Sequence, residues 1–280
     1  QGVSSAASDV YKRQTQQLIK VVEETNSSVI GLNKVSKDQI GNYGVVSFAA
    51  VGLRDIQIEN KLNDQRIKIL QAGKIYNAGI DVRTQFEDLE VKFINFKTGK
   101  LSSEFNNLSL DTYDQILATK DSSLSTQVPQ DKDIAIIKNR ENIGKVYIVR
   151  DSQGIISKLI LPIRGFGLWG TMYGYISLEN DFNTVAGIEF YQHKETPGLG
   201  AEVDNPKWKA LWPGKQIYQN NDVALKVIKG KVESDDSMLA YKVDGLSGAT
   251  LTSRGVSNMI EYWFSESGYS SMLKELDYES

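Results

Sequence analysis

Residues 244–250 read Asp-Gly-Leu-Ser-Gly-Ala-Thr and continue as Leu-Thr-Ser-Arg-Gly-Val to residue 256. The glycines and the alanine permit sharp turns and the close approach of another molecule. Immediately downstream, apolar residues recur at the spacing of one helix face, at Val256, Met259, Ile260, Trp263 and Phe264. The sequence therefore predicts that a cluster of hydroxyl side chains lies at the N-terminus of a helix: Ser247, Thr250, Thr252 and Ser253.

The start of such a helix is suited to hold an anion. Its first N–H groups have no partners within the helix, and this end carries a partial positive charge. A phosphate near Thr250 would therefore be held without a dedicated cluster of lysines or arginines. The simpler alternative is that Thr252 or Ser253 only caps the helix and that the glycines only turn the chain.

The full string resembles the Asp-Gly-x-[Ser/Thr]-Gly-Ala-Thr flavinylation motif of the FMN-binding domain family. The resemblance implies that Thr250 carries FMN through a phosphoester bond, and that a separate Mg²⁺-dependent flavin transferase supplies the flavin from FAD. It also implies that Ser247, Gly248 and Ala249 shape the recognised loop, and that Asp244 helps the transferase to recognise or activate the acceptor. A flavin tethered in this way cannot dissociate, so it would act as a fixed relay of electrons.

Composition narrows the class of function. The chain of 280 residues carries 32 lysines and arginines against 35 aspartates and glutamates, and its net charge of −3 gives no sign of a nucleic-acid partner. It has no cysteine, which excludes disulfides, cysteine-ligated zinc, iron–sulfur ligation and a thiol nucleophile. The single histidine, His193, excludes a multi-histidine metal site, so no metal site is expected. Redox chemistry would need an organic cofactor.

The N-terminal region divides into two parts. Residues 1–43 carry no pattern to which we attach a fold or a function. Residues 44–53 form the most apolar run, which is shorter than the roughly 18 residues of a membrane-spanning helix. That run is either a short buried helix or strand, or the remnant of a membrane anchor. Residues 54–72 are predicted to form a helix, and residues 73–280 the main domain.

The main domain alternates short apolar runs with turn residues, which predicts a β-rich core. Polar residues dominate 101–133, which we expect to be an exposed insertion. Predicted strands cover residues 91–96, 145–150, 155–162, 175–179, 185–192 and 224–230, of which the second and third form a hairpin. Predicted helices cover residues 205–212, ending before Pro213, and residues 269–280, in addition to the one after Thr250.

Two further stretches resemble segments that line the flavin in the FMN-binding domain family. They are Gly-Leu-Trp at residues 167–169 and His-Lys-Glu-Thr-Pro-Gly-Leu-Gly at residues 193–200. On their own chemistry, the glycines of the first could mark bulges on a packed sheet, and the second could be an ordinary tight turn. The resemblance implies that these stretches line the flavin with Gly167, Leu168, Trp169, Glu195, Thr196, Gly198 and Leu199.

The side chains of these stretches suggest individual roles. The Glu195 carboxylate and the Thr196 hydroxyl could hydrogen-bond the edge of the flavin ring, while Trp169 or Leu199 covers a ring face. In the family, a lysine at the position of Lys229 approaches the flavin, where a cation would stabilise an anionic flavin state. The alternative is that it is one exposed strand lysine. Arg164 is a weaker candidate for the flavin pocket, and His193 for proton transfer.

The resemblance extends upstream to residues 49–71, which begin Ala-Ala-Val-Gly-Leu-Arg-Asp. This stretch is similar to the end of the anchor in the flavin-carrying subunits of Na⁺-translocating NADH:quinone oxidoreductases. The resemblance implies an α+β fold with a mainly antiparallel sheet core and peripheral helices. It further implies a single N-terminal anchor in the bacterial inner membrane, a soluble domain on the periplasmic side, and other subunits of the complex as partners.

In such a complex the chain would relay electrons one at a time between redox centres on neighbouring subunits, without an NADH or quinone site of its own. Two alternatives stay open. The chain could be the homologous flavin subunit of an ion-translocating ferredoxin:NAD⁺ oxidoreductase. It could also be an unflavinylated binding or structural domain that kept the fold and lost the cofactor.

Overall fold

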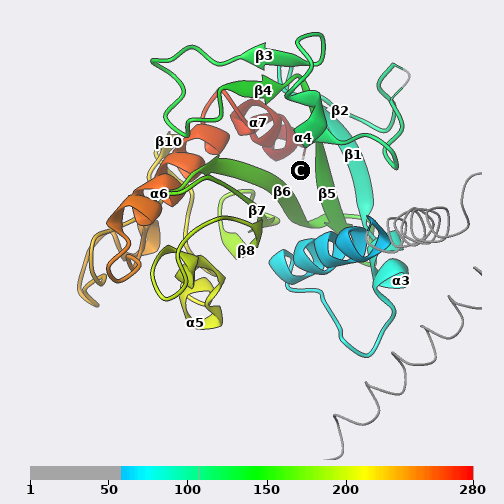
Figure 1. The fold of residues 1–280 in the computed structure, drawn as a ribbon. Helices are drawn as coiled ribbons and strands as arrows, with labels where there is room; N and C mark the ends of the chain where they lie inside the picture. Colours follow the sequence, from blue (N-terminus) through cyan, green and yellow to red (C-terminus); the bar gives the residue numbers. More distant parts are fainter. Residues whose placement is uncertain (1–57, 107, 280) are drawn as a thin grey trace, which may run out of the picture. The chain divides into compact units, whose positions relative to one another are not determined.

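The computed structural model describes residues 58–106 and 108–279 (Figure 1). The chain divides into two compact units, Gln1–Leu62 and Asn63–Ser280, of which the second contains the sheet. The expected helix over 54–72 is present over residues 58–72. The non-matching segment 1–43 and the anchor expected within 44–57 lie outside the described residues. Within the described residues, no helix has both the length and the apolar character needed to cross a membrane.

The core is one antiparallel sheet, which confirms the predicted fold class. Its strands are β1 (Glu90–Asn95), β2 (Leu101–Ser102), β5 (Ile143–Arg150), β6 (Ile156–Phe166), β7 (Thr171–Glu179) and β8 (Val185–Gln192). Their order across the sheet is β2-β1-β5-β6-β7-β8. The predicted hairpin is confirmed as β5 and β6, which pair with Tyr147 opposite Ile160.

Helices lie around this sheet. They are α3 (Val82–Glu87), α4 (Gln115–Ala118), α5 (Pro206–Lys209), α6 (Thr250–Phe264) and α7 (Ser270–Glu279), with 3-10 helices at Gly200–Asp204 and Leu239–Tyr241. Short strand pairs complete the described fold: β3 (Ser125–Gln127) with β4 (Asn139–Glu141), β9 (Tyr218–Gln219) with β10 (Asp222–Val223), and β11 (Lys226–Val227) with β12 (Lys242–Val243). The segment 101–133 is mostly exposed or half-buried in its described residues and contains only β2, α4 and β3.

Two predicted elements are shorter than expected. The strand predicted over 224–230 is reduced to β11, because the chain turns at Gly230 with a φ of +82° that a regular strand does not adopt. The helix predicted over 205–212 is reduced to α5. Asn205 caps it by accepting from the Lys207 N–H, and the chain leaves helical geometry ahead of Pro213.

The sheet is covered on both faces because successive strand residues point to opposite sides. Leu159 and Leu161 belong to the core cluster that contains the apolar residues of α6 and α7. Ile160, between them, belongs to a second cluster with Leu70 of the helix over residues 58–72 and Tyr175 of β7. Burying each such side chain contributes about 1.5–3 kcal/mol. α6 therefore packs on the face of the sheet that carries Leu159 and Leu161.

A buried carboxylate links the helix over residues 58–72 to α5. Glu189 of β8 accepts hydrogen bonds at one oxygen from Lys68 Nζ (3.1 Å) and from Lys209 Nζ (2.6 Å). The Glu189 side chain is 7% exposed and that of Lys209 is 10% exposed. The two ammonium groups offset the cost of burying the carboxylate.

Stacked tyrosines predict a loss of stability at high pH. Tyr175 stacks on Tyr191 with ring centroids 5.0 Å apart and meets Tyr147 edge-on at 6.1 Å, and burial raises the pKa of all three phenols. Their contribution is fully present below the unfolded pKa of about 10 and is lost as pH rises toward the folded pKa values. We expect the free energy of unfolding in urea to fall above about pH 10, together with the appearance of tyrosinate absorbance. Tyr147→Phe is expected to weaken this pH dependence. Ionisation of all tyrosines near their ordinary pKa in the folded chain would contradict the prediction.

Candidate functional site

The stretch 244–250 folds into a turn that places Thr250 at the first position of α6. The Ala249 N–H donates to the Leu246 carbonyl (3.1 Å), and Gly248 adopts a φ of +70°, which glycine tolerates without strain. Leu246 and Ala249 are buried, whereas Thr250 is exposed. No side chain caps the N-terminus of this 15-residue helix. The Thr250 hydroxyl therefore lies at an open helix N-terminus with its partial positive charge.

Neither hydroxyl that was considered as a helix cap has that role. Thr252 and Ser253 lie in the first turn of α6 and are buried. Thr252 Oγ1 donates to Glu195 Oε2 (2.5 Å), and Ser253 Oγ accepts from the Leu246 N–H (3.0 Å). The capping interpretation is therefore wrong, and both hydroxyls instead connect α6 to the loops around it.

Asp244 holds the turn in place. Its carboxylate accepts from the Val232 N–H (2.9 Å), and its carbonyl accepts from Trp208 Nε1 (2.8 Å). Next to it, a Cβ on Gly245 would lie 2.3 Å from the Ile228 carbonyl oxygen, so only glycine allows this approach. These contacts bring the turn against residues 228–232 and α5.

A cleft of about 600 Å³ lies beside Thr250. Its walls are the 244–250 turn, residues 228–231, and α5 with the Leu211 that follows it. Three lysines line it, Lys207, Lys229 and Lys231, and Asp244 is the one acidic residue in its lining. In volume it falls within the range of small-molecule sites, and in charge it suits an anion. Sequence reasoning identified Lys229 but not Lys207, Trp208 or Leu211, which no motif marks.

The two other flavin-like stretches lie close to the turn. Leu199, at the end of the 195–199 turn, packs so closely on Gly248 that a Cβ there would lie 3.0 Å from Leu199 Cδ2. The side chains of Leu168, Trp169 and Leu199 are 39%, 62% and 44% exposed, and Thr196 and Gly198 are also exposed. The three stretches are therefore close in space, and their exposed apolar side chains, Leu168, Trp169 and Leu199, are called the apolar surface.

Glu195 lies beneath this surface and is only 5% exposed. One carboxylate oxygen accepts from the Leu168 N–H and the Trp169 N–H (both 3.0 Å), and the other accepts from Thr252. His193 supports the same turn. Its Nδ1 accepts from the Glu195 N–H (3.2 Å), so its Nε2–H donates to Asp204 (2.8 Å). Both oxygens of Glu195 are thus engaged by groups of the chain itself.

Arg164 is not part of this arrangement, which corrects the sequence-based expectation. Its side chain is 7% exposed and lies 2.7 Å from the Glu141 carboxylate, an ion pair by distance rather than a well-aligned hydrogen bond. It also donates to the Asn139 carbonyl (2.9 Å) and lies 5.2 Å from the centroid of the Trp263 ring. Arg164 is a core residue beneath α6.

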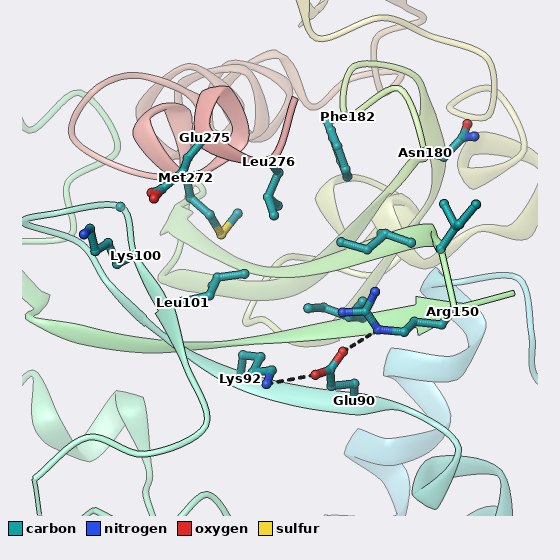
Figure 2. A pocket seen from close by; sticks show the side chains of 14 residues that line it. Glu90, Lys92, Lys100, Leu101, Arg150, Asn180, Phe182, Met272, Glu275 and Leu276 are labelled. Carbon is teal, nitrogen blue, oxygen red and sulfur yellow. Dashed lines mark hydrogen bonds and ion pairs between the residues drawn. The ribbon is translucent and has the colours of Figure 1, made fainter. Parts of the chain in front are cut away.

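A second cleft, of about 800 Å³, contains none of the expected flavin residues. Figure 2 shows it between α7, with Met272 and Leu276, and the strands that carry Glu90 and Arg150. Glu90 pairs with Lys92 (2.9 Å) and with Arg150 (2.7 Å), and these partners lower the pKa of its carboxyl. Glu90, Lys92 and Arg150 of this cleft are thus engaged with one another.

Comparisons with known proteins agree with this geometry. The FMN-binding domain family matches residues 167–265. The C subunit of the Na(+)-translocating NADH-quinone reductase of Pseudomonas aeruginosa is 44% identical over 236 residues, which are 82% of this chain and 89% of that protein. The corresponding protein of Vibrio vulnificus is 39% identical over 257 residues, or 91% of this chain and 95% of that protein.

Solved structures are similar as well. The crystal structure of Shewanella oneidensis NqrC has a TM-score of 0.71 and 36% identity, and the match covers 79% of this chain and 99% of that one. The crystal structure of the Na(+)-translocating NADH-quinone reductase C subunit from Parabacteroides distasonis has a TM-score of 0.59 and 29% identity, with 79% and 96% covered.

Proposed function

The chain belongs to the family of Na⁺-translocating NADH-quinone reductase C subunits, and from that premise we propose that it carries FMN on Thr250 through a phosphoester bond and relays electrons within such a complex. The observation that carries the proposal is the exposed Thr250 hydroxyl at the uncapped start of α6. A phosphate ester there meets unpaired N–H groups and a positive helix end. The turn formed by Ser247, Gly248 and Ala249 leaves that hydroxyl open to a flavin transferase.

The residues around Thr250 fit FMN. Lysines of the adjoining cleft, Lys229 among them, supply positive charge for the phosphate and for a reduced, anionic ring. Trp169 and Leu199 offer exposed apolar faces that would cover the ring and exclude water, and Gly167, Leu168, Thr196 and Gly198 form the loops around them. Bound FMN supplies the redox chemistry, accepting and passing on single electrons.

The names of the relatives support a role within a larger complex. They are subunits of NADH-quinone reductases, which favours that complex over a ferredoxin:NAD⁺ oxidoreductase. In this proposal, the other subunits are the electron donor and acceptor, and the chain has no complete NADH or quinone site of its own. An N-terminal anchor holds it in the bacterial inner membrane, with the flavin domain on the periplasmic side.

Mass spectrometry tests the proposal directly. The chain is coexpressed with a flavin transferase, and its intact mass is expected to increase by one FMN less one water. Trypsin cleaves after Lys242 and Arg254, so the modification is expected on the peptide from Val243 to Arg254. Fragmentation of that peptide locates the ester among its hydroxyl residues. A chain that stays unmodified would overturn the proposal in favour of an unflavinylated binding domain.

Trp169→Ala is expected to change the absorption and fluorescence of the attached flavin. Loss of an aromatic contact removes about 0.5–1.5 kcal/mol of interaction and lets water reach the ring. Flavin spectra and the midpoint potential of the purified chain measure the effect, and Trp169→Phe, which keeps an aromatic face, is the control. Unchanged spectra and potential in the alanine variant would place Trp169 outside the flavin pocket.

A further inference from the structure

Glu195 is a buried carboxylate whose hydrogen bonds connect its own segment to two others. It accepts from two backbone N–H groups of the 167–170 loop, at 3.0 Å each, and from the Thr252 hydroxyl on α6, while its own backbone lies in the 193–200 segment. Hydrogen bonds to an ionised acceptor are stronger than neutral ones. The carboxylate therefore joins the three matched stretches at one point.

The packing around this carboxylate leaves no room for side chains. A Cβ on Gly167 would lie 2.5 Å from Glu195 Oε1, and one on Gly200 would lie 2.6 Å from Oε2. On the α6 side, a Cβ on Gly255 would lie 2.4 Å from the Phe166 carbonyl oxygen. Glycine at these three positions lets the backbones close around the carboxylate and brings α6 against the end of β6.

The hydrogen bonds of Glu195 end at or next to the residues proposed to hold the flavin. Thr252 lies two positions after Thr250 in the same helical turn, and the Trp169 N–H binds the other oxygen of Glu195. Within the 167–170 loop, the Gly167 N–H donates to the Gly170 carbonyl (2.8 Å), but the Leu168 and Trp169 N–H groups depend on Glu195.

We propose that Glu195 is a positioning residue rather than a flavin ligand, and that Thr252 is its partner on α6. The carboxylate holds the Trp169 loop at a fixed place relative to the Thr250 acceptor. This inference rests on the proposed function, because it assigns Trp169 and Thr250 to one flavin. It also places a fixed negative charge beneath the site, which opposes reduction of a flavin that gains negative charge.

Hydrogen exchange of the unflavinylated chain tests the positioning role without the cofactor. The chain is expressed without a transferase, and exchange of the Leu168 and Trp169 N–H groups is followed by NMR. Glu195→Ala is expected to speed exchange at both by at least about tenfold, because each loses a charged acceptor. Glu195→Gln keeps an acceptor oxygen and is expected to retain most of the protection. Protection that survives in Glu195→Ala would overturn the proposal.

The partner on α6 is tested in the same way. Thr252→Val removes the hydroxyl and is expected to weaken protection of the 167–170 loop, whereas Thr252→Ser is expected to restore it. Glu202→Gln is the matched control, since Glu202 lies in the neighbouring 3-10 helix and accepts from Asn205 (2.6 Å). If Thr252→Val exchanges in the 167–170 loop at the same rate as the wild-type chain and Thr252→Ser, then Thr252 is not the partner.

A potential measurement on the flavinylated chain separates positioning from a purely structural role. Glu195→Gln removes the charge and is expected to shift the flavin midpoint potential to more positive values, beyond any shift in Glu202→Gln. Equal potentials in the two variants would contradict the electrostatic part of the proposal. If the chain is never flavinylated, the proposed function fails, but hydrogen exchange still decides whether Glu195 holds the loop.

Discussion

Thr250→Ala is expected to abolish covalent flavin completely while leaving the fold intact. The substitution removes the acceptor hydroxyl from an exposed position at the start of α6. Alanine is the best helix former and needs no space that threonine does not already occupy. Intact mass after coexpression with a flavin transferase measures the modification, and circular dichroism and urea unfolding report on the fold.

Thr250→Ser is the matched variant, because it keeps a hydroxyl at the same position. We expect it to be flavinylated at least in part. Full covalent flavin on the Thr250→Ala chain would show that another hydroxyl is the acceptor. Thr252 and Ser253 are poor substitutes, since both are buried and hydrogen-bonded within the chain.

Arg164→Met is expected to lower the free energy of unfolding by about 3–5 kcal/mol, because it leaves the Glu141 carboxylate buried without its cation. The Glu141 side chain is 1% exposed, and Arg164 lies 2.7 Å from it. The change also removes the hydrogen bond to the Asn139 carbonyl and the contact with the Trp263 ring. Urea unfolding of the wild-type and variant chains measures the loss.

A double-mutant cycle separates the ion pair from packing. In Arg164→Met with Glu141→Met, both charges are replaced by apolar groups, and we expect much of the lost stability to return. A loss below about 1 kcal/mol in the single variant would show that the pair is solvated. The flavin spectrum is expected to stay unchanged in either variant that folds, because the side chain of Arg164 contacts the core groups Glu141, Asn139 and Trp263.

Strands with alternating apolar residues were predictable from the sequence, and their ends were less so. The strand predicted over 185–192 coincides with β8, whereas β6 runs to Phe166, beyond the predicted end at Pro162. Proline cannot donate to a neighbouring strand, which argues against a strand interior. Ile160 is the last residue of β6 that pairs with β5, so Pro162 pairs with β7 alone. Whether a proline fits inside a strand depends on which neighbour it pairs with, and a local sequence pattern does not show that pairing.

The site was predictable where its residues stand in one string and unpredictable where the partners are distant. The Asp-Gly-Leu-Ser-Gly-Ala-Thr stretch marked Thr250, and periodicity placed it at a helix start. Nothing local connects Glu195 with Thr252, which are 57 residues apart, or reveals that the Glu195 carboxylate faces the chain itself. Arg164 was a candidate for the flavin pocket for the same reason, since its partner Glu141 is on another strand and distant in the sequence.

The contact between Gly255 and the Phe166 carbonyl affects how precisely Thr250 is held relative to the sheet. Interfaces made of side chains adjust by changing rotamers, so a mutation nearby shifts them by small amounts. Here two backbones touch directly, and neither has a torsion that can change without moving its whole element. The position of the start of α6 is therefore set by the position of the sheet. Core substitutions elsewhere are expected to displace Thr250 little.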